Sequence, residues 1–234
     1  MKSSSALKKI AVFDIDGTVF RSSLLIKLVE ELTRQGVFSA KTVKHYQKAH
    51  QDWLDRKGGY EDYIAGIIKV YDSNIKGLSY KKFDSIAEKV IKAEQNHTYR
   101  YTRDLVKQLK KQGYYVVAIS HSPKSALEPF CKALGFSKVY GIMYEADKKG
   151  KLTGEKMFTD LILKKDRILK RLLDRHPELS LRDSVGVGDT ASDIAFLKLV
   201  EKPICFNPNQ ELYSYAKKHK WKIVVERKDV IYNY

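Results

Sequence analysis

The segment 10–18 reads Ile-Ala-Val-Phe-Asp-Ile-Asp-Gly-Thr. A short apolar run that ends in acidic residues and glycine is typical of a buried β-strand followed by a turn. Asp14 and Asp16 supply the carboxylate oxygens that a hard cation such as Mg²⁺ prefers. Gly17 allows the backbone to approach a bound oxyanion closely. Taken alone, the segment is explained about equally well by an acidic turn after a strand.

Two later segments end in the same way. The apolar run 115–119 leads into Ser120, and the run 184–188 leads into Asp189. In open α/β sheets, ligands bind outside the carboxyl ends of the strands, and the helices that follow present free N–H groups to an anion. We therefore expect Asp14, Ser120 and Asp189 to converge at one edge of a parallel sheet.

Apolar runs alternate with amphipathic segments along most of the chain, which predicts a doubly wound, Rossmann-like α/β core with a parallel sheet. Near-continuous apolar strands fit a sheet that is covered on both faces. The predicted strands span 9–13, 114–119, 138–144, 184–187, 203–206 and 222–225. The predicted helices span 98–111, 123–134, 160–175, 192–199 and 210–218.

One part of the chain interrupts this alternation. From about residue 21 to 95 the pattern is helical throughout, with three apolar stripes separated by glycines. We therefore predict an inserted helical cap subdomain at 21–97 and a core domain made of 1–20 and 98–234. The aromatic residues of the cap fit its interior better than a site for a ring-shaped ligand. A short hairpin is expected at 144–156, with Lys149 and Gly150 at its turn.

Lys165 occupies an unusual place in the predicted helix 160–175. It falls within the apolar stripe that Leu161 and Ile168 define, whereas Lys164 lines up with the charged face. A lysine among core residues normally extends toward solvent or pairs with an anion. We therefore favour Lys165 over Lys164 as a phosphate ligand at the sheet edge.

The segment around Asp189 suggests a second set of carboxylates. Gly186 and Gly188 precede Asp189, and Asp193 follows four residues later. If a helix begins near Thr190, both carboxylates point toward the same edge. An acidic helix N-terminus explains Asp193 alone, but it does not explain the two glycines. The glycine pair therefore favours a functional site at this strand end over a plain acidic helix N-terminus.

Ser120 is followed by His121, Ser122 and Pro123. Pro123 fits the first position of a helix and Ser122 its N-cap, which leaves the Ser120 hydroxyl free to bind a phosphate. A Ser120–His121 nucleophile pair is less well supported, because adjacent side chains rarely aim at each other and no Gly-x-Ser-x-Gly elbow surrounds Ser120. His121 is either a plain loop histidine or a neighbour of the phosphate.

The composition narrows the remaining classes of function. Hydrophobic residues make up 43% and charged residues 31% of the chain, as in globular proteins. No apolar run is long enough to span a membrane, so we expect a cytoplasmic protein without a membrane partner. Cys131 and Cys205 form no metal-binding pattern. The net charge of +16 attracts anions in general. The oligomeric state is open.

In this order, these residues resemble the four motifs of the haloacid dehalogenase-like superfamily. The first motif is similar to 14–18, the second to Ser120, the third to Lys165 and the fourth to 188–193. The resemblance spans about 8–20 and 98–226. The insertion point and the Ser-Asp-Ile ending of the fourth motif are most similar to the phosphoserine phosphatase-like branch.

The resemblance implies a phosphoric monoester hydrolase that acts on a small phosphorylated metabolite and forms an aspartyl-phosphate on Asp14. Asp16 would protonate the leaving oxygen and then activate water. The phosphoryl group would be bound by Ser120, Lys165, Gly17 and His121.

The resemblance also implies Mg²⁺ as the cofactor. The ion would be held by Asp14, by the backbone carbonyl of Asp16 and by Asp189, and Asp193 would hold the ion's water shell or support its ligands. A cap that closes over the site would exclude water and select the substrate.

One position departs from the pattern of this branch. Ser23 stands where phosphoserine phosphatases usually carry a glutamate that holds the substrate's amino group, so the resemblance does not extend to phosphoserine as the substrate. The basic charge keeps a second hypothesis open, a phosphatase or phosphotransferase that acts on a nucleic-acid end or a phospholipid head. A non-catalytic binding protein is a third hypothesis, which the presence of all four motifs disfavours.

Overall fold

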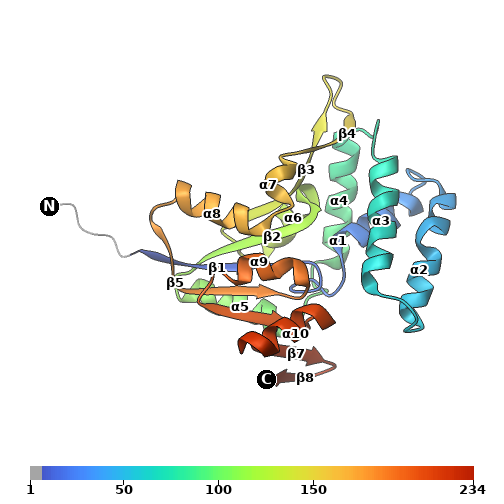
Figure 1. The fold of residues 1–234 in the computed structure, drawn as a ribbon. Helices are drawn as coiled ribbons and strands as arrows, with labels where there is room; N and C mark the ends of the chain where they lie inside the picture. Colours follow the sequence, from blue (N-terminus) through green and yellow to red (C-terminus); the bar gives the residue numbers. More distant parts are fainter. Residues whose placement is uncertain (1–6) are drawn as a thin grey trace.

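The computed structural model describes residues 7–234, and these form an eight-stranded sheet in the order β4-β3-β2-β1-β5-β6-β7-β8 (Figure 1). The inner strands β3, β2, β1, β5, β6 and β7 run parallel to one another. The two edge strands are antiparallel to their neighbours, β4 to β3 and β8 to β7. The strand bounds are β1 Lys8–Phe13, β2 Tyr115–Pro123, β3 Lys138–Ala146, β4 Leu152–Met157, β5 Leu179–Gly188, β6 Lys202–Phe206, β7 Lys222–Arg227 and β8 Val230–Asn233.

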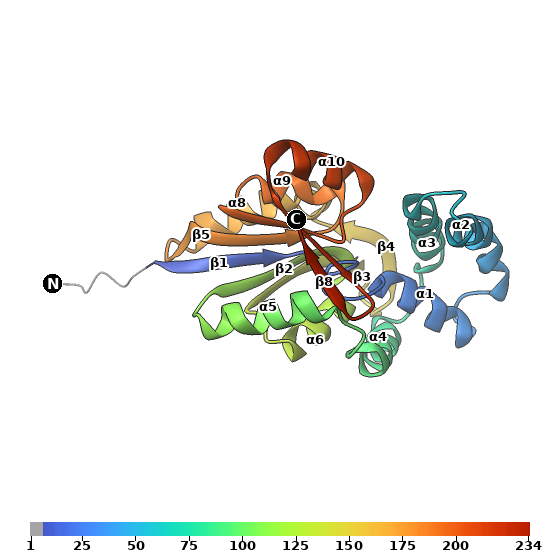
Figure 2. The same ribbon diagram turned by 90° about the horizontal axis from the view of Figure 1, so that it is seen from below.

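Helices cover both faces of this sheet. They are α5 Arg100–Lys111, α6 Lys124–Ala133, α8 Lys165–Arg175, α9 Ile194–Leu197 and α10 Gln210–His219. Along β1, Ala11 and Phe13 pack with α5 and α6, whereas Ile10 and Val12 pack with α8, α9 and α10. Figure 2 shows the two helical layers on opposite sides of the strands. The predicted doubly wound α/β architecture is therefore confirmed.

A helical region lies between β1 and α5, beyond the carboxyl ends of the strands (Figure 1). Its elements are α1 Leu24–Arg34, η1 Ala40–Val43, α2 Lys44–Leu54, α3 Tyr60–Asn74 and α4 Tyr80–Glu94. Their buried apolar side chains join the same cluster that lies under α5 and α6. The helical character agrees with the sequence pattern, while a separate subdomain at 21–97 stays a prediction.

A hairpin formed by β3 and β4 supports this helical region. Gly150 has a φ of +71° at the turn, and its carbonyl accepts a 2.8 Å hydrogen bond from the backbone N–H of Tyr80. Leu152 donates its N–H to the Leu78 carbonyl at 2.8 Å and accepts one from Gly77 at 2.8 Å. The hairpin thus fixes the chain that enters α4, and the predicted hairpin at 144–156 is confirmed.

The structure differs from the sequence expectation at the segment before Lys165. The predicted helix 160–175 is two helices, α7 Thr159–Ile162 and α8, separated at Lys164, which has φ −123° and ψ 89°. The break lets α7 pack on β3 while Lys165, the first residue of α8, reaches toward the sheet edge. Lys165 is therefore buried as predicted, but it does not lie in the middle of a continuous helix.

Two further differences concern short elements. The predicted helix 192–199 is a 3-10 turn, η2 Ala191–Asp193, followed by α9. Pro123 ends β2 and is the N-cap of α6, with a ψ of 132°, instead of the first helical residue. Within residues 7–234, no helix combines the length and the apolar character that a membrane crossing requires.

Candidate active site

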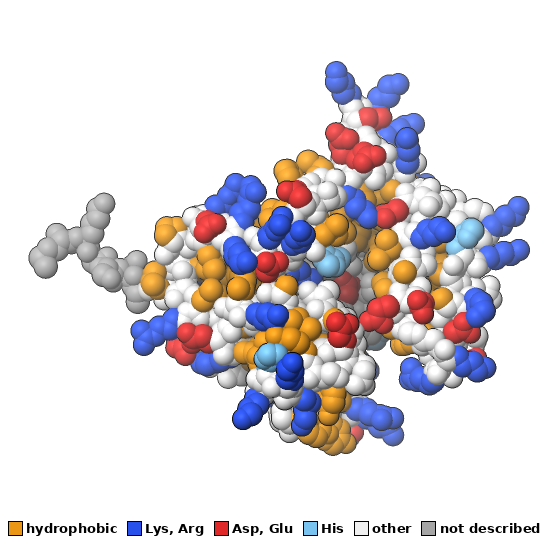
Figure 3. All heavy atoms as spheres, in the orientation of Figure 1, with side chains coloured by type: hydrophobic (Ala, Val, Ile, Leu, Met, Phe, Trp, Pro, Cys, Tyr) orange, Lys and Arg blue, Asp and Glu red, His pale blue; other side chains and the backbone are white. Residues whose placement is uncertain are grey.

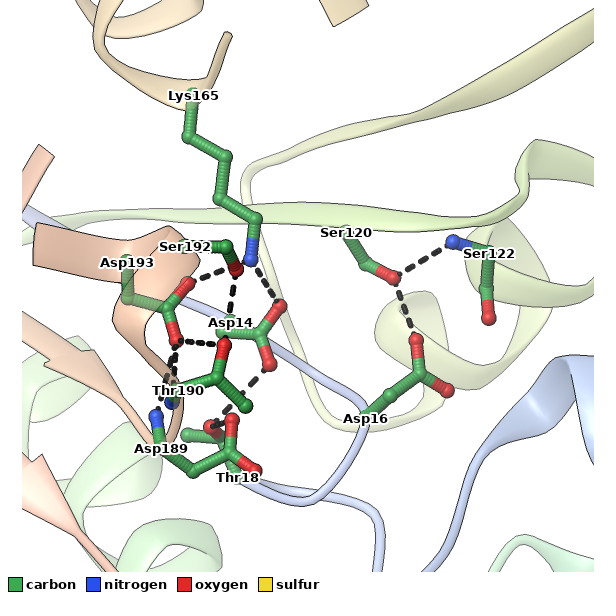
Figure 4. A network of polar contacts seen from close by, with 10 residues as sticks. All are labelled: Asp14, Asp16, Thr18, Ser120, Ser122, Lys165, Asp189, Thr190, Ser192 and Asp193. Carbon is green, nitrogen blue, oxygen red and sulfur yellow. Dashed lines mark hydrogen bonds and ion pairs between the residues drawn. The ribbon is translucent and has the colours of Figure 1, made fainter. Parts of the chain in front are cut away.

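Asp14 and Asp189 directly follow the adjacent strands β1 and β5, and Ser120 lies near the carboxyl end of β2, the other neighbour of β1. The backbone N–H of Asp14 donates to the Val187 carbonyl at 2.9 Å, which joins the end of β1 to the end of β5. The residues that sequence analysis assigned to separate motifs are therefore brought together, and Figure 4 shows their polar contacts.

The turn after β1 is shaped by Gly17 and Thr18. Gly17 has a φ of +76°, and a Cβ atom at this position would lie 2.1 Å from Oδ2 of Asp189. Only glycine fits such a close approach in that conformation. The Thr18 hydroxyl contacts both sides of the site, since its Oγ1 lies 3.0 Å from Oδ1 of Asp189 and 3.3 Å from Oδ2 of Asp14. Thr18 was part of the quoted motif, but its role as this bridge was not predicted.

Lys165 joins two of the buried acids. Its Nζ atom donates to Oδ1 of Asp14 and to Oδ1 of Asp193, each at 2.6 Å (Figure 4). Burial opposes the charge on Lys165, but Asp14 and Asp193 outweigh that effect and raise the pKa of the amine. The lysine is therefore a fixed cation beside the Asp14 carboxylate.

Asp193 is fully buried, and both of its carboxylate oxygens have protein partners. Oδ1 accepts from Lys165, and Oδ2 accepts the backbone N–H groups of Asp189 and Thr190, each at 3.0 Å. A Cβ atom on Gly188 would lie 2.5 Å from Cβ of Asp193, which explains the glycine before Asp189. This geometry favours Asp193 as a residue that positions Lys165 and the loop, and disfavours it as a direct metal ligand.

Asp16 points away from Lys165 and toward β2 (Figure 4). Its Oδ1 accepts the backbone N–H of Leu24 at 2.6 Å, and its Oδ2 accepts the hydroxyl of Ser120 at 2.6 Å. The Ser120 oxygen in turn accepts the N–H of Ser122 at 2.9 Å. Ser120 therefore lies in the predicted site, with its hydroxyl proton engaged by Asp16.

The carboxylates of Asp14, Asp189 and Asp193 lie close together, with one oxygen of each within 4.8 Å of the others, so that Asp14 and Asp189 could hold a metal ion with Asp193 beside it. Burial raises the pKa of Asp14 to about 7, and Asp193 and Asp16 add to the shift while Lys165 reduces it. Burial also raises the pKa of Asp189, and the neighbouring Asp14 adds to that effect. A divalent cation would offset this repulsion, and an all-oxygen donor set suits Mg²⁺.

His121 lies beside the cavity next to Ser120. Its Nε2 atom is buried without a hydrogen-bond partner among the described residues. Burial lowers the pKa of His121 to about 4, and the nearby Lys165 adds to the effect. The imidazole is therefore neutral at physiological pH.

Asp14, Asp16, His121, Lys165 and Asp189 line a cavity of about 370 Å³ between the strand ends and the helical region. The helical region contributes Tyr60 and Glu61, and the start of α10 contributes Asn209 and Glu211. Asn209 donates to Oε1 of Glu61 at 3.0 Å, which links the two sides of the cavity. Sequence reasoning missed these contributions to the cavity, because an acid in the first turn of a helix is a common helix-stabilising feature and carries no separate signal.

The haloacid dehalogenase-like hydrolase family model matches residues 11–198. The chain therefore belongs to this family of hydrolases. It is 25% identical to the histidinol-phosphatase of Neisseria meningitidis serogroup C over 93% of this chain and 99% of that protein. It is 24% identical to the phosphoserine phosphatase of Methanocaldococcus jannaschii over 95% of this chain and 94% of that one.

The fold is also found among solved structures. A phospho-aspartyl intermediate analogue of phosphoserine phosphatase matches with a TM-score of 0.61 and 22% identity, over 95% of both chains. This similarity shows a shared fold. The family model that matches residues 11–198 confirms the family expected from the motifs, and the curated relatives named above are phosphatases.

Proposed function

We propose that the protein is a Mg²⁺-dependent phosphatase that hydrolyses a phosphate monoester through an aspartyl-phosphate on Asp14. The observation that carries the proposal is the buried Asp14 carboxylate, which is bonded to Lys165 at 2.6 Å and grouped with Asp189. The named phosphatase relatives support the reaction class. The neighbouring structure of a phospho-aspartyl intermediate analogue supports the covalent step.

In the first step, an oxygen of Asp14 attacks phosphorus, and the bond between phosphorus and the ester oxygen breaks. Asp16 gives a proton to the departing oxygen, so the leaving group departs as an alcohol. Lys165 binds phosphoryl oxygens and stabilises the charge that develops on them. The Ser120 hydroxyl, which donates to Asp16 at 2.6 Å in this structure, would turn to a phosphoryl oxygen of the bound substrate. Neutral His121 adds a further hydrogen-bonding group at the same edge.

In the second step, Asp16 takes a proton from water, and the water oxygen attacks the phosphorus of the aspartyl-phosphate. The bond to Asp14 breaks, which releases inorganic phosphate and restores the carboxylate. Asp14 and Asp189, with the backbone carbonyl of Asp16, would hold Mg²⁺. The bound ion supplies positive charge that screens the carboxylates from the phosphate dianion.

The cavity also limits the leaving group. Its lining includes Tyr60 and Glu61 from α3 and Glu211 from α10. Carboxylates at this place repel a polyanionic leaving group and favour a small one that carries a positive charge, such as an ammonium group. The substrate class that fits is therefore a phosphate ester of a small amino alcohol, and a polyanionic substrate fits the cavity poorly.

The test is phosphate release from a panel of phosphorylated metabolites with Mg²⁺, beside an Asp14→Asn variant. The panel contains phosphoserine, histidinol phosphate, sugar phosphates and nucleotides. Turnover that Asp14→Asn abolishes, with the highest kcat/KM for an ammonium-bearing ester, would support both parts of the proposal. Equal turnover by Asp14→Asn would contradict the assignment of Asp14 as the nucleophile. A preference for nucleotides would contradict the proposed ammonium-bearing leaving group.

A further inference from the structure

A second cavity lies between β3, β4 and the helices α7 and α8, outside the site described above. We name it the α7–α8 groove. It has a volume of about 270 Å³, and none of the described residues that line it is acidic. Its apolar lining includes Met143, Met157, Phe158 and Leu161, and its basic lining includes Arg171 and Arg175. The proposed phosphatase mechanism uses none of these side chains.

The cations beside the groove belong to a basic stripe on α8. Arg167, Arg171 and Arg175 follow one another at intervals of four residues, which places them on one helical face, and Lys164 lies just before the helix. In the part of the chain that the structure describes, none of the four has a carboxylate within 4.0 Å. Like charges at this spacing repel one another, so the stripe attracts an anion from outside the chain. Figure 3 shows basic side chains gathered over α8 beside hydrophobic atoms over α7.

The apolar side of the groove is unusually exposed. Phe158 is 59% exposed and Met143 is 38% exposed. Met143 and Met157 face each other across the β3–β4 pair, so their side chains lie on the same face of the hairpin. Methionine side chains are flexible and adapt to ligands of different shape. Most of the apolar groups are aliphatic, which suits an alkyl chain better than a stack of nucleic-acid bases.

We propose that the α7–α8 groove binds an anionic amphiphile with a single aliphatic chain, such as a medium-chain carboxylate. The chain lies along the methionines, Phe158 and Leu161, and the anionic head pairs with Arg171 and Arg175. Guanidinium groups bind carboxylates through two parallel hydrogen bonds, which gives the head group a defined position. The inference is independent of the reaction at Asp14.

The test is isothermal titration calorimetry of the full chain with octanoate, decanoate and decanol. We expect saturable binding of one decanoate per chain. Affinity increases by about fourfold for each added methylene until the groove is filled, and decanol binds more weakly than decanoate. No saturable binding, or equal affinity for decanoate and decanol, would overturn the proposal.

Matched variants locate the site. Arg171→Gln combined with Arg175→Gln removes two exposed cations, and we expect it to lower decanoate affinity at least tenfold. Lys170→Gln, on another face of the same helix and paired with Asp166 at 3.2 Å, is the control and leaves affinity unchanged. We expect Phe158→Ser to lower the affinity for decanoate and for decanol by the same factor, because it removes a contact with the alkyl chain and none with the head group. Equal losses in the control and the double variant would show that the groove is not the site.

Two other occupants are distinguished by further measurements. Binding to phosphatidylglycerol vesicles without affinity for free decanoate would show that the groove contacts a membrane surface and does not bind a free amphiphile. A dimer on size-exclusion chromatography that Phe158→Ser converts to a monomer would show that a second copy of the chain covers the groove. Either result would contradict the proposal.

Discussion

Lys165 is the cation that offsets the buried carboxylates of Asp14 and Asp193, which lie 2.6 Å from it on either side. Asp189 adds a third carboxylate to the cluster, and within residues 7–234 its carboxylate accepts a hydrogen bond only from Thr18. One lysine therefore faces three acids. The excess of negative charge among these buried groups would be offset by a divalent cation, which in turn attracts an anionic substrate to the site.

Replacing Lys165 by methionine tests this balance at the residue scale. Lys165→Met removes the charge beside Asp14, and we expect kcat/KM to fall by about a hundredfold to a thousandfold. Lys164→Met changes the neighbouring exposed lysine and is the control, with kcat/KM within about twofold of the wild type. Steady-state kinetics with Mg²⁺ give the answer, and equal effects of the two substitutions would contradict the assignment of Lys165.

His121 gives a prediction about pH. Its folded-state pKa of about 4 lies below its ordinary value of 6.5. The unfolded chain therefore binds a proton on His121 in a range where the folded chain does not, and this difference destabilises the protein as the pH falls from about 6.5 to about 4. We expect the wild type to lose more stability over this range than His121→Gln. Thermal melting measures the difference, with the exposed His45→Gln as the control.

This pH-dependent loss of stability would be absent if His121 gained a proton in the folded protein near its ordinary pKa. In that case the wild type, His121→Gln and His45→Gln would lose stability in parallel as the pH falls.

At the scale of elements, the turn after β1 could be predicted from the sequence with its chemistry. An apolar run followed by Asp14, Asp16 and Gly17 indicates both the strand and the acidic turn that follows it. The break at Lys164 could not be predicted, because no proline or glycine marks it and the apolar stripe continues through it. The break depends on packing of α7 against β3, which is a long-range contact that local periodicity does not encode.

Gly17 tests the geometry of that turn. Gly17→Ala places a Cβ atom 2.1 Å from Oδ2 of Asp189 in a left-handed conformation, so we expect loss of activity and of Mg²⁺ binding. Gly36 also has a positive φ, of +69°, but it has no atom within 4 Å of the added Cβ position. Gly36→Ala is therefore the control, with a cost of about 1–2 kcal/mol in stability and normal activity. Comparable losses of activity would show that backbone strain alone explains the effect.

At the scale of the whole molecule, the sequence could predict a doubly wound core and a helical insertion beyond the strand ends. It could not predict how that insertion meets the core. Asn209 bonds Glu61 across 148 positions of sequence, and neither residue type is unusual at the start of a helix. Sequence reasoning therefore located the core side of the cavity and missed the residues of the helical region and of α10 that line its other side.

Glu61 tests the contact between the helical region and the core. Glu61→Gln keeps the size of the side chain and removes its charge. We expect KM for ammonium-bearing phosphate esters to increase about tenfold with little change in kcat, and no change for neutral sugar phosphates. Glu88→Gln, an exposed acid on α4 outside this cavity, is the control. An equal change for both kinds of ester would contradict the proposed contact.

Mg²⁺ removal tests the folded protein as a whole. Because binding to the folded state alone stabilises it, saturating Mg²⁺ at about a hundred times its Kd contributes about 2.7 kcal/mol. We expect EDTA to abolish activity and lower the melting temperature, and Mg²⁺ to restore both. In Asp189→Asn, Mg²⁺ should no longer raise the melting temperature. Full activity in metal-free buffer would contradict the proposed Mg²⁺ dependence.

The central claim is that Asp14 becomes phosphorylated during turnover. The direct measurement is to stop the reaction during turnover, reduce the protein with borohydride and locate the modified residue by peptide mass spectrometry. Reduction converts an acyl phosphate into an alcohol, which marks the phosphorylated residue. The account predicts that Asp14 alone is converted, only when substrate and Mg²⁺ are both present. Conversion of another residue, or active turnover without conversion of Asp14, would contradict the claim.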